Sequence, residues 1–253
     1  MLVGNDVVDL TAERTRGKSA NQRFLDRILD PIERDYVAAS DTPDFDLWCL
    51  WAAKEAAYKI ASKQRETPPP FEHATFGVRW DPDAADGTAE RAGTVRWQEL
   101  EAMVLVTAGE GFVHAIAHAV AGDADTSGVG PPTMETIGVG VGRLEAEDAP
   151  WAGDYETLLK RLTPREADAV HSPASLSVRL GARADLAQAL GVEEPRVEIV
   201  CAPGQTGRRP PWVLLDGEPT RADVSLSHDG PWLAWAWSVG SRGAGRASGA
   251  EGP

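Results

Sequence analysis

Cysteine is scarce in this sequence of 253 residues, which contains only Cys49 and Cys201. They lie far apart in apolar surroundings, so the sequence predicts neither a disulfide framework nor a cysteine-based zinc site. No apolar run approaches the length that a membrane-spanning helix requires. Basic residues are outnumbered as well, with 25 lysines and arginines against 39 acids and a net charge of −14. We therefore expect neither a membrane nor a nucleic-acid partner, and any anionic substrate must bind a local cluster of cations.

The first ten residues, MLVGNDVVDL, are too short and too acidic for a signal peptide, so we expect a cytoplasmic protein. They are predicted to form a strand, in which alternation places Asp6 and Val8 on one face and Val7 and Asp9 on the other. Acids are unfavourable inside a valine-rich strand. The two aspartates therefore either cap the next element or serve a site.

The stretch LWCLWAAKEAAYK, residues 47–59, contains neither glycine nor proline and is predicted to be a helix. Trp48 and Trp51 lie on its apolar stripe, which Glu55 continues. Glu55 also precedes Lys59 by four residues, so a surface ion pair is one interpretation. In the other, a carboxylate in line with tryptophans lies at the edge of something buried, where it needs a partner or a metal.

The order of predicted elements repeats once along the chain. The segment 161–166 is similar to 27–33, and a long helix at 176–190 takes the place of the first central helix. We expect an α+β fold made of a first half, a linker rich in glycine and proline, a second half and a disordered tail: residues 1–120, 121–133, 134–239 and 240–253.

Two histidines, His114 and His118, lie in a predicted strand at 113–120. Such a pair is a metal candidate on a helix. On a strand with alternating polar residues we expect both side chains to face solvent.

Three motifs together resemble those of the 4′-phosphopantetheinyl transferases: Gly4-x-Asp6, the Lys54-Glu55-Ala-x-x-Lys59 helix, and Ser225-Leu226-Ser227-His228. The resemblance implies a pseudo-dimer of two α+β halves that transfers phosphopantetheine from coenzyme A to a serine of an acyl, polyketide or peptidyl carrier protein. In the surfactin-type enzymes the histidine-bearing half comes first, whereas the order here is reversed. The first half has no histidine in the matching stretch 106–110, so one site between the halves is implied.

The resemblance also implies a magnesium site made by Asp6 and Glu55, since Mg²⁺ usually binds one or two protein carboxylates. Whether Asp9 joins them stays open. Asp6, Glu55 and Lys59 are the implied catalytic residues, with Lys59 neutralising the departing phosphate or steering Glu55. The general base is either Glu55 or a metal-bound water.

Coenzyme A is expected to bind His228 through its 3′-phosphate, with Ser227 assisting. The segment Gly204-Gln-Thr-Gly-Arg208-Arg209-Pro210 resembles a phosphate-binding segment of the family, although a solvated turn is the alternative. Lys54 is a further implied ligand of coenzyme A. Trp232 is expected either to flank the nucleotide or to belong to the core.

An acidic carrier protein requires a basic docking surface, because this chain is itself strongly acidic. The densest group of cations comprises Arg14, Arg16, Lys18, Arg23 and Arg27. We expect a monomer with one such surface. Two other functions stay open: a non-catalytic homologue that binds coenzyme A or a carrier, and a metal-dependent phosphohydrolase.

Overall fold

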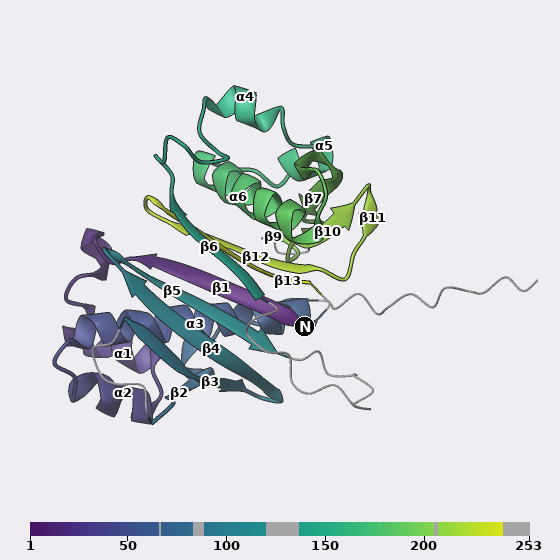
Figure 1. Cartoon of the computed structure of the whole chain (residues 1–253). Coiled ribbons are helices and arrows are strands. Elements are labelled where there is room, and N and C mark those ends of the chain that lie inside the picture. Colours follow the sequence, from purple (N-terminus) through teal and green to yellow (C-terminus); the bar gives the residue numbers. More distant parts are fainter. Residues whose placement is uncertain (66, 83–88, 120–136, 205–206, 240–253) are drawn as a thin grey trace, which may run out of the picture.

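The computed structural model describes residues 1–65, 67–82, 89–119, 137–204 and 207–239 (Figure 1). The predicted linker 121–133 and tail 240–253 lie outside these ranges. The described chain is a mixture of helices and antiparallel strands, which confirms the predicted α+β class. Among these residues no helix is both long and apolar enough to cross a bilayer.

The first half is a five-stranded sheet in the order β1-β5-β4-β3-β2, with helices packed on one face (Figure 1). Its strands are β1 (Leu2–Asp9), β2 (Gly77–Trp80), β3 (Glu90–Trp97), β4 (Leu100–Gly109) and β5 (Phe112–Ala119). Its helices are α1 (Gln22–Ile28), α2 (Pro31–Ala38) and α3 (Pro43–Lys63), with single 3₁₀ turns at Glu13–Thr15, Lys18–Ala20 and His73–Thr75.

The central helix α3 packs directly on β1, because small residues occupy the contact. Ala52, Ala53, Ala56 and Ala57 are fully buried, which lets the helix backbone approach the sheet. A Cβ added to Gly4 would lie 1.9 Å from the carbonyl oxygen of Ala56. The glycine of the Gly-x-Asp motif is therefore required for close packing, and it fixes Asp6 relative to α3.

The second half repeats the same element order. Its helices are α4 (Tyr155–Leu159), α5 (Pro164–Ala167) and α6 (Pro173–Leu190). Its strands are β6 (Ile137–Arg143), β7 (Val197–Val200), β8 (Pro203–Gly204), β9 (Gly207–Arg208), β10 (Trp212–Leu215), β11 (Glu218–Pro219), β12 (Asp223–Asp229) and β13 (Trp232–Ser238). The strand order β6-β13-β12 matches β1-β5-β4 in the first half.

The prediction that His114 and His118 face solvent was wrong. Strand β5 lies between β1 and β4; α3 packs on one of its faces, and β13 of the second half contacts the other. His114 is fully buried, and His118 is 8% exposed. Alternation along the strand was therefore no guide to exposure.

Candidate active site

The two halves meet where β1 and β12 run parallel to each other. Because β1 is an edge strand, its outward amides need partners. Alternate side chains of β12 accept these hydrogen bonds: Val3 N to Asp223 Oδ2 at 2.7 Å, Asn5 N to Ser225 Oγ at 3.0 Å, Val7 N to Ser227 Oγ at 3.2 Å and Asp9 N to Asp229 Oδ2 at 2.8 Å. The Ser-Leu-Ser-His stretch thus joins the second half to the Gly-x-Asp strand.

Two lysines of α3, one turn apart, bridge the same pair of strands. Lys59 Nζ donates to Asn5 O at 2.5 Å, to Asp6 Oδ1 at 3.2 Å and to Leu226 O at 3.3 Å. Lys63 Nζ donates to Val3 O at 2.7 Å, to Asp223 Oδ2 at 2.8 Å and to Val224 O at 2.7 Å. Sequence reasoning missed Lys63, for which the only signal was its four-residue spacing from Lys59.

The Asp6 carboxylate lies at the centre of this contact, and its side chain is only 14% exposed. Ser227 Oγ donates to Asp6 Oδ1 at 2.8 Å, and Lys59 reaches the same oxygen. The pKa of Asp6 is raised to about 6: burial is the largest cause and the Glu55 carboxylate adds to it, while the charge of Lys59 and the hydrogen bond from Ser227 oppose the rise. Both hydrogen bonds from the described residues end on Oδ1, which leaves Oδ2 for another ligand.

Glu55 lies one turn before Lys59 on α3, and its Oε1 is 3.5 Å from His73 Nε2. Its charge acts on Asp6, so two carboxylates of one sign share this region. No group of three or more histidine, cysteine or acidic side chains suited to a metal occurs among the residues that the structure describes. A pair of carboxylates fits Mg²⁺, which prefers oxygen ligands and retains waters.

His228 follows Ser227 on β12 and is exposed to solvent. Desolvation by the surrounding protein and the charge of Lys59 lower the pKa of His228, while Asp229 raises it. Asp229 forms an ion pair with Arg14 of the first half. The histidine therefore lies at the end of the β1–β12 contact, beside the basic segment that follows β1.

A cavity of about 240 Å³ opens between the halves next to the two lysines. Its lining comes from α3, from the segment that follows α3, from residues 209–211 and from β12: Tyr58, Lys59, Ser62, Lys63, Pro68, Arg209, Pro210, Pro211, Ser225 and Leu226. The structure thus brings Arg209 to the cavity that Lys59 lines. The Arg208 side chain lies outside the described part.

Residues 2–117 match the family model of the 4′-phosphopantetheinyl transferase superfamily. The first half belongs to this superfamily. The structure also matches the crystal structure of holo-[acyl-carrier-protein] synthase from Neisseria meningitidis, with 19% identity and a TM-score of 0.34, over 46% of this chain and 97% of that one. A comparison with curated proteins found no match.

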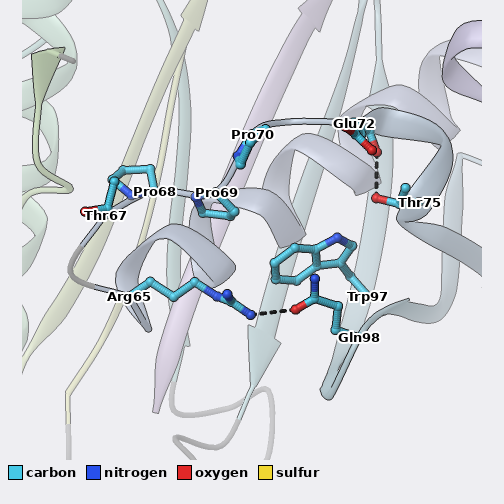
Figure 2. A pocket seen from close by; sticks show the side chains of 9 residues that line it. All are labelled: Arg65, Thr67, Pro68, Pro69, Pro70, Glu72, Thr75, Trp97 and Gln98. Carbon is cyan, nitrogen blue, oxygen red and sulfur yellow. Dashed lines mark hydrogen bonds between the residues drawn. The ribbon is translucent and has the colours of Figure 1, made fainter. Parts of the chain in front are cut away.

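A larger cavity of about 590 Å³ lies beside the end of the transferase helix α3 (Figure 2). It is lined by Arg65, Thr67, Pro68, Pro69, Pro70, Glu72, Thr75, Trp97 and Gln98. Arg65 donates to Gln98 Oε1 at 2.6 Å and lies over the Trp97 ring. None of the acids or histidines of the transferase motifs lines this cavity, although Pro68 lines both cavities.

Lys54 is not brought to the candidate site, although it belongs to the transferase motif. Its side chain is fully buried, and Nζ donates to Glu33 Oε2 at 2.6 Å, to Phe76 O at 2.7 Å and to His73 O at 3.1 Å. All three N–H groups are therefore used inside the first half.

Asp9 and Trp232, two further candidates from the sequence, contact residues close to them. Asp9 Oδ1 accepts from Thr11 N at 2.9 Å and from Thr11 Oγ1 at 2.6 Å, which closes the turn after β1. Trp232 is 8% exposed, and its ring lies 4.4 Å from that of Phe112 and under Arg143. The Asp9 carboxylate thus closes a turn, and Trp232 packs between the halves.

The basic segment after β1 is exposed and adjoins the site through the Arg14–Asp229 ion pair. Arg16 donates to Thr11 O at 3.3 Å, and both Lys18 and Arg27 lie over the Phe24 ring. Arg23 and Arg27 are exposed on α1. Of the cations expected to dock a carrier, Arg14 and Arg16 thus lie just after β1, and Lys18 and Arg27 meet at the Phe24 ring of α1.

Proposed function

We propose that this protein transfers the 4′-phosphopantetheine group of coenzyme A to a serine hydroxyl of an apo carrier protein, with Mg²⁺, and releases 3′,5′-bisphosphoadenosine. One observation carries the proposal: Asp6 of the first half accepts a hydrogen bond from Ser227 of the second half, and the Glu55 carboxylate is close enough for its charge to act on Asp6. Superfamily membership of residues 2–117 supports the type of group transferred.

Asp6 and Glu55 would hold the magnesium ion, which when bound supplies positive charge to the pyrophosphate oxygens. The raised pKa of Asp6 supports this assignment, because burial and the nearby Glu55 carboxylate make its negative charge unfavourable even beside Lys59, and a divalent cation would offset this cost. Oδ2 of Asp6 is the oxygen that remains for the ion.

Transfer of a phosphoryl group depends mostly on positioning and on neutralisation of charge. Ser227 donates to Asp6 and fixes its orientation, and Lys59 holds Asp6 against β12. The Lys59 ammonium also makes the neighbouring cavity favourable for an anion. Glu55 would accept the proton of the carrier serine.

The 3′-phosphate and pyrophosphate of coenzyme A require cations that are not engaged inside a half. We assign them to His228, Arg209 and Arg208. His228 is exposed, and Arg209 lines the cavity beside Lys59. Lys54 is left out of this set, because its ammonium is buried in the first half.

The acidic carrier protein would dock on the basic segment formed by Arg14, Arg16, Lys18, Arg23 and Arg27. Opposite charges steer encounter and orient the partner. Reversal of Arg16 and Arg23 to glutamate is expected to raise KM for the carrier and leave KM for coenzyme A unchanged. Arg221→Glu, at an exposed position of the second half, is the control.

A non-catalytic protein that binds coenzyme A or a carrier is the second candidate. It is favoured by the structural use of Lys59, whose three hydrogen bonds connect strands of the two halves. The same polar residues would then stabilise the interface without turnover.

The test is incubation of the protein with coenzyme A, Mg²⁺ and apo carrier proteins from fatty-acid, polyketide and peptide synthesis, followed by mass spectrometry of the carriers. A gain of one phosphopantetheine on the carrier serine is expected. Binding of coenzyme A without any change in carrier mass would favour the non-catalytic protein.

A further inference from the structure

His73 lies next to the proposed base without being part of any motif. It belongs to the segment 67–76, which connects α3 to β2 and runs back along one face of α3. Contacts with this segment come from residues of α3 spaced by three or four positions. Tyr58 Oη donates to Pro69 O at 3.0 Å, the Tyr58 and Phe71 rings are 4.3 Å apart, and Lys54 Nζ donates to the His73 carbonyl.

The imidazole ring of His73 is held by two aromatic neighbours. Its centroid is 3.8 Å from that of Phe71 and 4.2 Å from that of Trp51. With the backbone fixed by the buried Lys54 ammonium, the ring has little freedom to rotate. Its Nε2 is therefore held in one place, 3.5 Å from Glu55 Oε1.

Nε2 of His73 is buried and makes no hydrogen bond within the described chain. A distance of 3.5 Å to Glu55 is at the outer limit of a hydrogen bond. Leaving a buried polar atom without a partner is unfavourable. A small rotation of the glutamate would complete the bond with an N–H at Nε2.

The second half shows that the fold itself does not need this histidine. The two halves can be aligned on a strand amide that donates to a buried glutamate: Val78 N in the first half and Ile199 N in the second. In this alignment Glu194, which pairs with Arg183, takes the position of His73. Ala184, which follows Arg183, takes the position of Glu55, which follows Lys54. The imidazole and its carboxylate partner occur together in the first half, and the second half has neither.

We propose that His73 is a positioning residue that donates a hydrogen bond to Glu55 and orients this carboxylate for the magnesium ion and the carrier serine. The proposal rests on the proposed function. Groups behind a metal ligand typically change metal affinity or activity by about 10–100-fold when they are removed.

Two substitutions separate this role from packing. His73→Phe keeps an aromatic ring against Trp51 and Phe71 and removes the N–H, whereas His73→Gln keeps a donor and removes the ring. His171→Phe, at an exposed position of the second half, is the matched control. Thermal unfolding and circular dichroism establish that each variant folds.

The measurements are kcat, KM for coenzyme A and for the carrier, and Mn²⁺ affinity by electron paramagnetic resonance with coenzyme A present. His73→Phe is expected to lower kcat and Mn²⁺ affinity by about 10-fold or more without a change in KM for the carrier. His73→Gln is expected to restore most of both. Unchanged Mn²⁺ affinity and kcat in folded His73→Phe would overturn the proposal, as would equal losses in the two variants.

The two proposals fail in different ways. A wild-type protein that binds Mn²⁺, loses that affinity in His73→Phe and modifies no carrier supports the role of His73 and overturns the proposed function. A wild-type protein that binds no Mn²⁺ overturns the role of His73.

Discussion

Each half contains the same buried ion pair, between a glutamate and a cation of its central helix, but the side chains that follow this cation differ between the halves. Glu33 completes the capping box of α2, accepts from Val78 N and pairs with Lys54 of α3 at 2.6 Å. Glu166 completes the capping box of α5, accepts from Ile199 N and pairs with Arg183 of α6 at 3.1 Å. Each pair ties the central helix of its half to a capping box and a strand, so it belongs to the scaffold.

After the cation of the shared ion pair, the sequences of α3 and α6 differ. The first half continues with Glu55, Lys59 and Lys63, whereas the second has Ala184 and Gln188 at the positions of the first two. The residues without a counterpart are those that reach Asp6 or β12. Comparison of the halves thus separates groups that the fold requires from groups that the proposed chemistry requires.

The largest expected effect comes from breaking the shared pair. Lys54→Met and Arg183→Met should each reduce the free energy of unfolding by about 3–5 kcal/mol, because each leaves a buried carboxylate unpaired. Burial raises the pKa of Glu33 and lowers that of Lys54, so each charge depends on the other. Denaturant unfolding measures the losses. A Lys54→Met protein of normal stability with a raised KM for coenzyme A would contradict the scaffold assignment.

Removing the charge of Asp6, which is not part of the ion pair that the halves share, should change the free energy of unfolding in the opposite direction. Its folded pKa is about 6 against an ordinary value of 3.8, so the folded state binds more protons than the unfolded state between these values. Stability contributed by the protonated carboxyl is therefore lost as pH rises through this window. Asp6→Asn is expected to stabilise the metal-free protein by about 3 kcal/mol at pH 7 and by much less at pH 4. Urea titration at both pH values tests this, and lower stability of Asp6→Asn at pH 7 would contradict it.

A matched pair of serines sharpens the comparison at the β1–β12 contact. Ser225→Ala and Ser227→Ala each leave a β1 amide without its partner, which should destabilise the protein by about 1–3 kcal/mol. Only Ser227 also donates to Asp6. We therefore expect similar losses of stability in both variants and a loss of kcat in Ser227→Ala alone. Equal kcat values in the two variants would remove the positioning role of Ser227.

The smallest effect is expected at His228. Its replacement by alanine should raise KM for coenzyme A about tenfold, which corresponds to the loss of one charge-assisted hydrogen bond. KM for 3′-dephospho-coenzyme A should not change. Steady-state kinetics with both substrates makes the test, and a parallel rise with both would show that His228 does not bind the 3′-phosphate.

Local signals in the sequence predicted much of the fold and of the site. The helix predicted at residues 47–59 lies entirely within α3. The Gly-x-Asp and Ser-Leu-Ser-His motifs do lie side by side. These features depend on residues close in sequence or on motifs whose chemistry requires them to meet.

Contacts between distant segments could not be predicted in this way. The resemblance implied Lys54 as a ligand of coenzyme A, but neighbouring helical residues point about 100° apart, and Lys54 enters the core whereas Glu55 does not. The burial of His114 depends on a second half that packs on β5. Neither Lys63 nor His73 belongs to a motif, so only the folded chain reveals that they reach β12 and Glu55.

The most direct test of a transferase site built across the two halves is the rate of carrier modification by the wild type, Asp6→Asn and Glu55→Gln, followed by mass spectrometry. Asp41→Asn, at an exposed position, is the control. We expect Mg²⁺-dependent transfer by the wild type and the control, and losses on the order of 10²–10³-fold in the other two. Transfer at the wild-type rate by either acid variant would contradict the account.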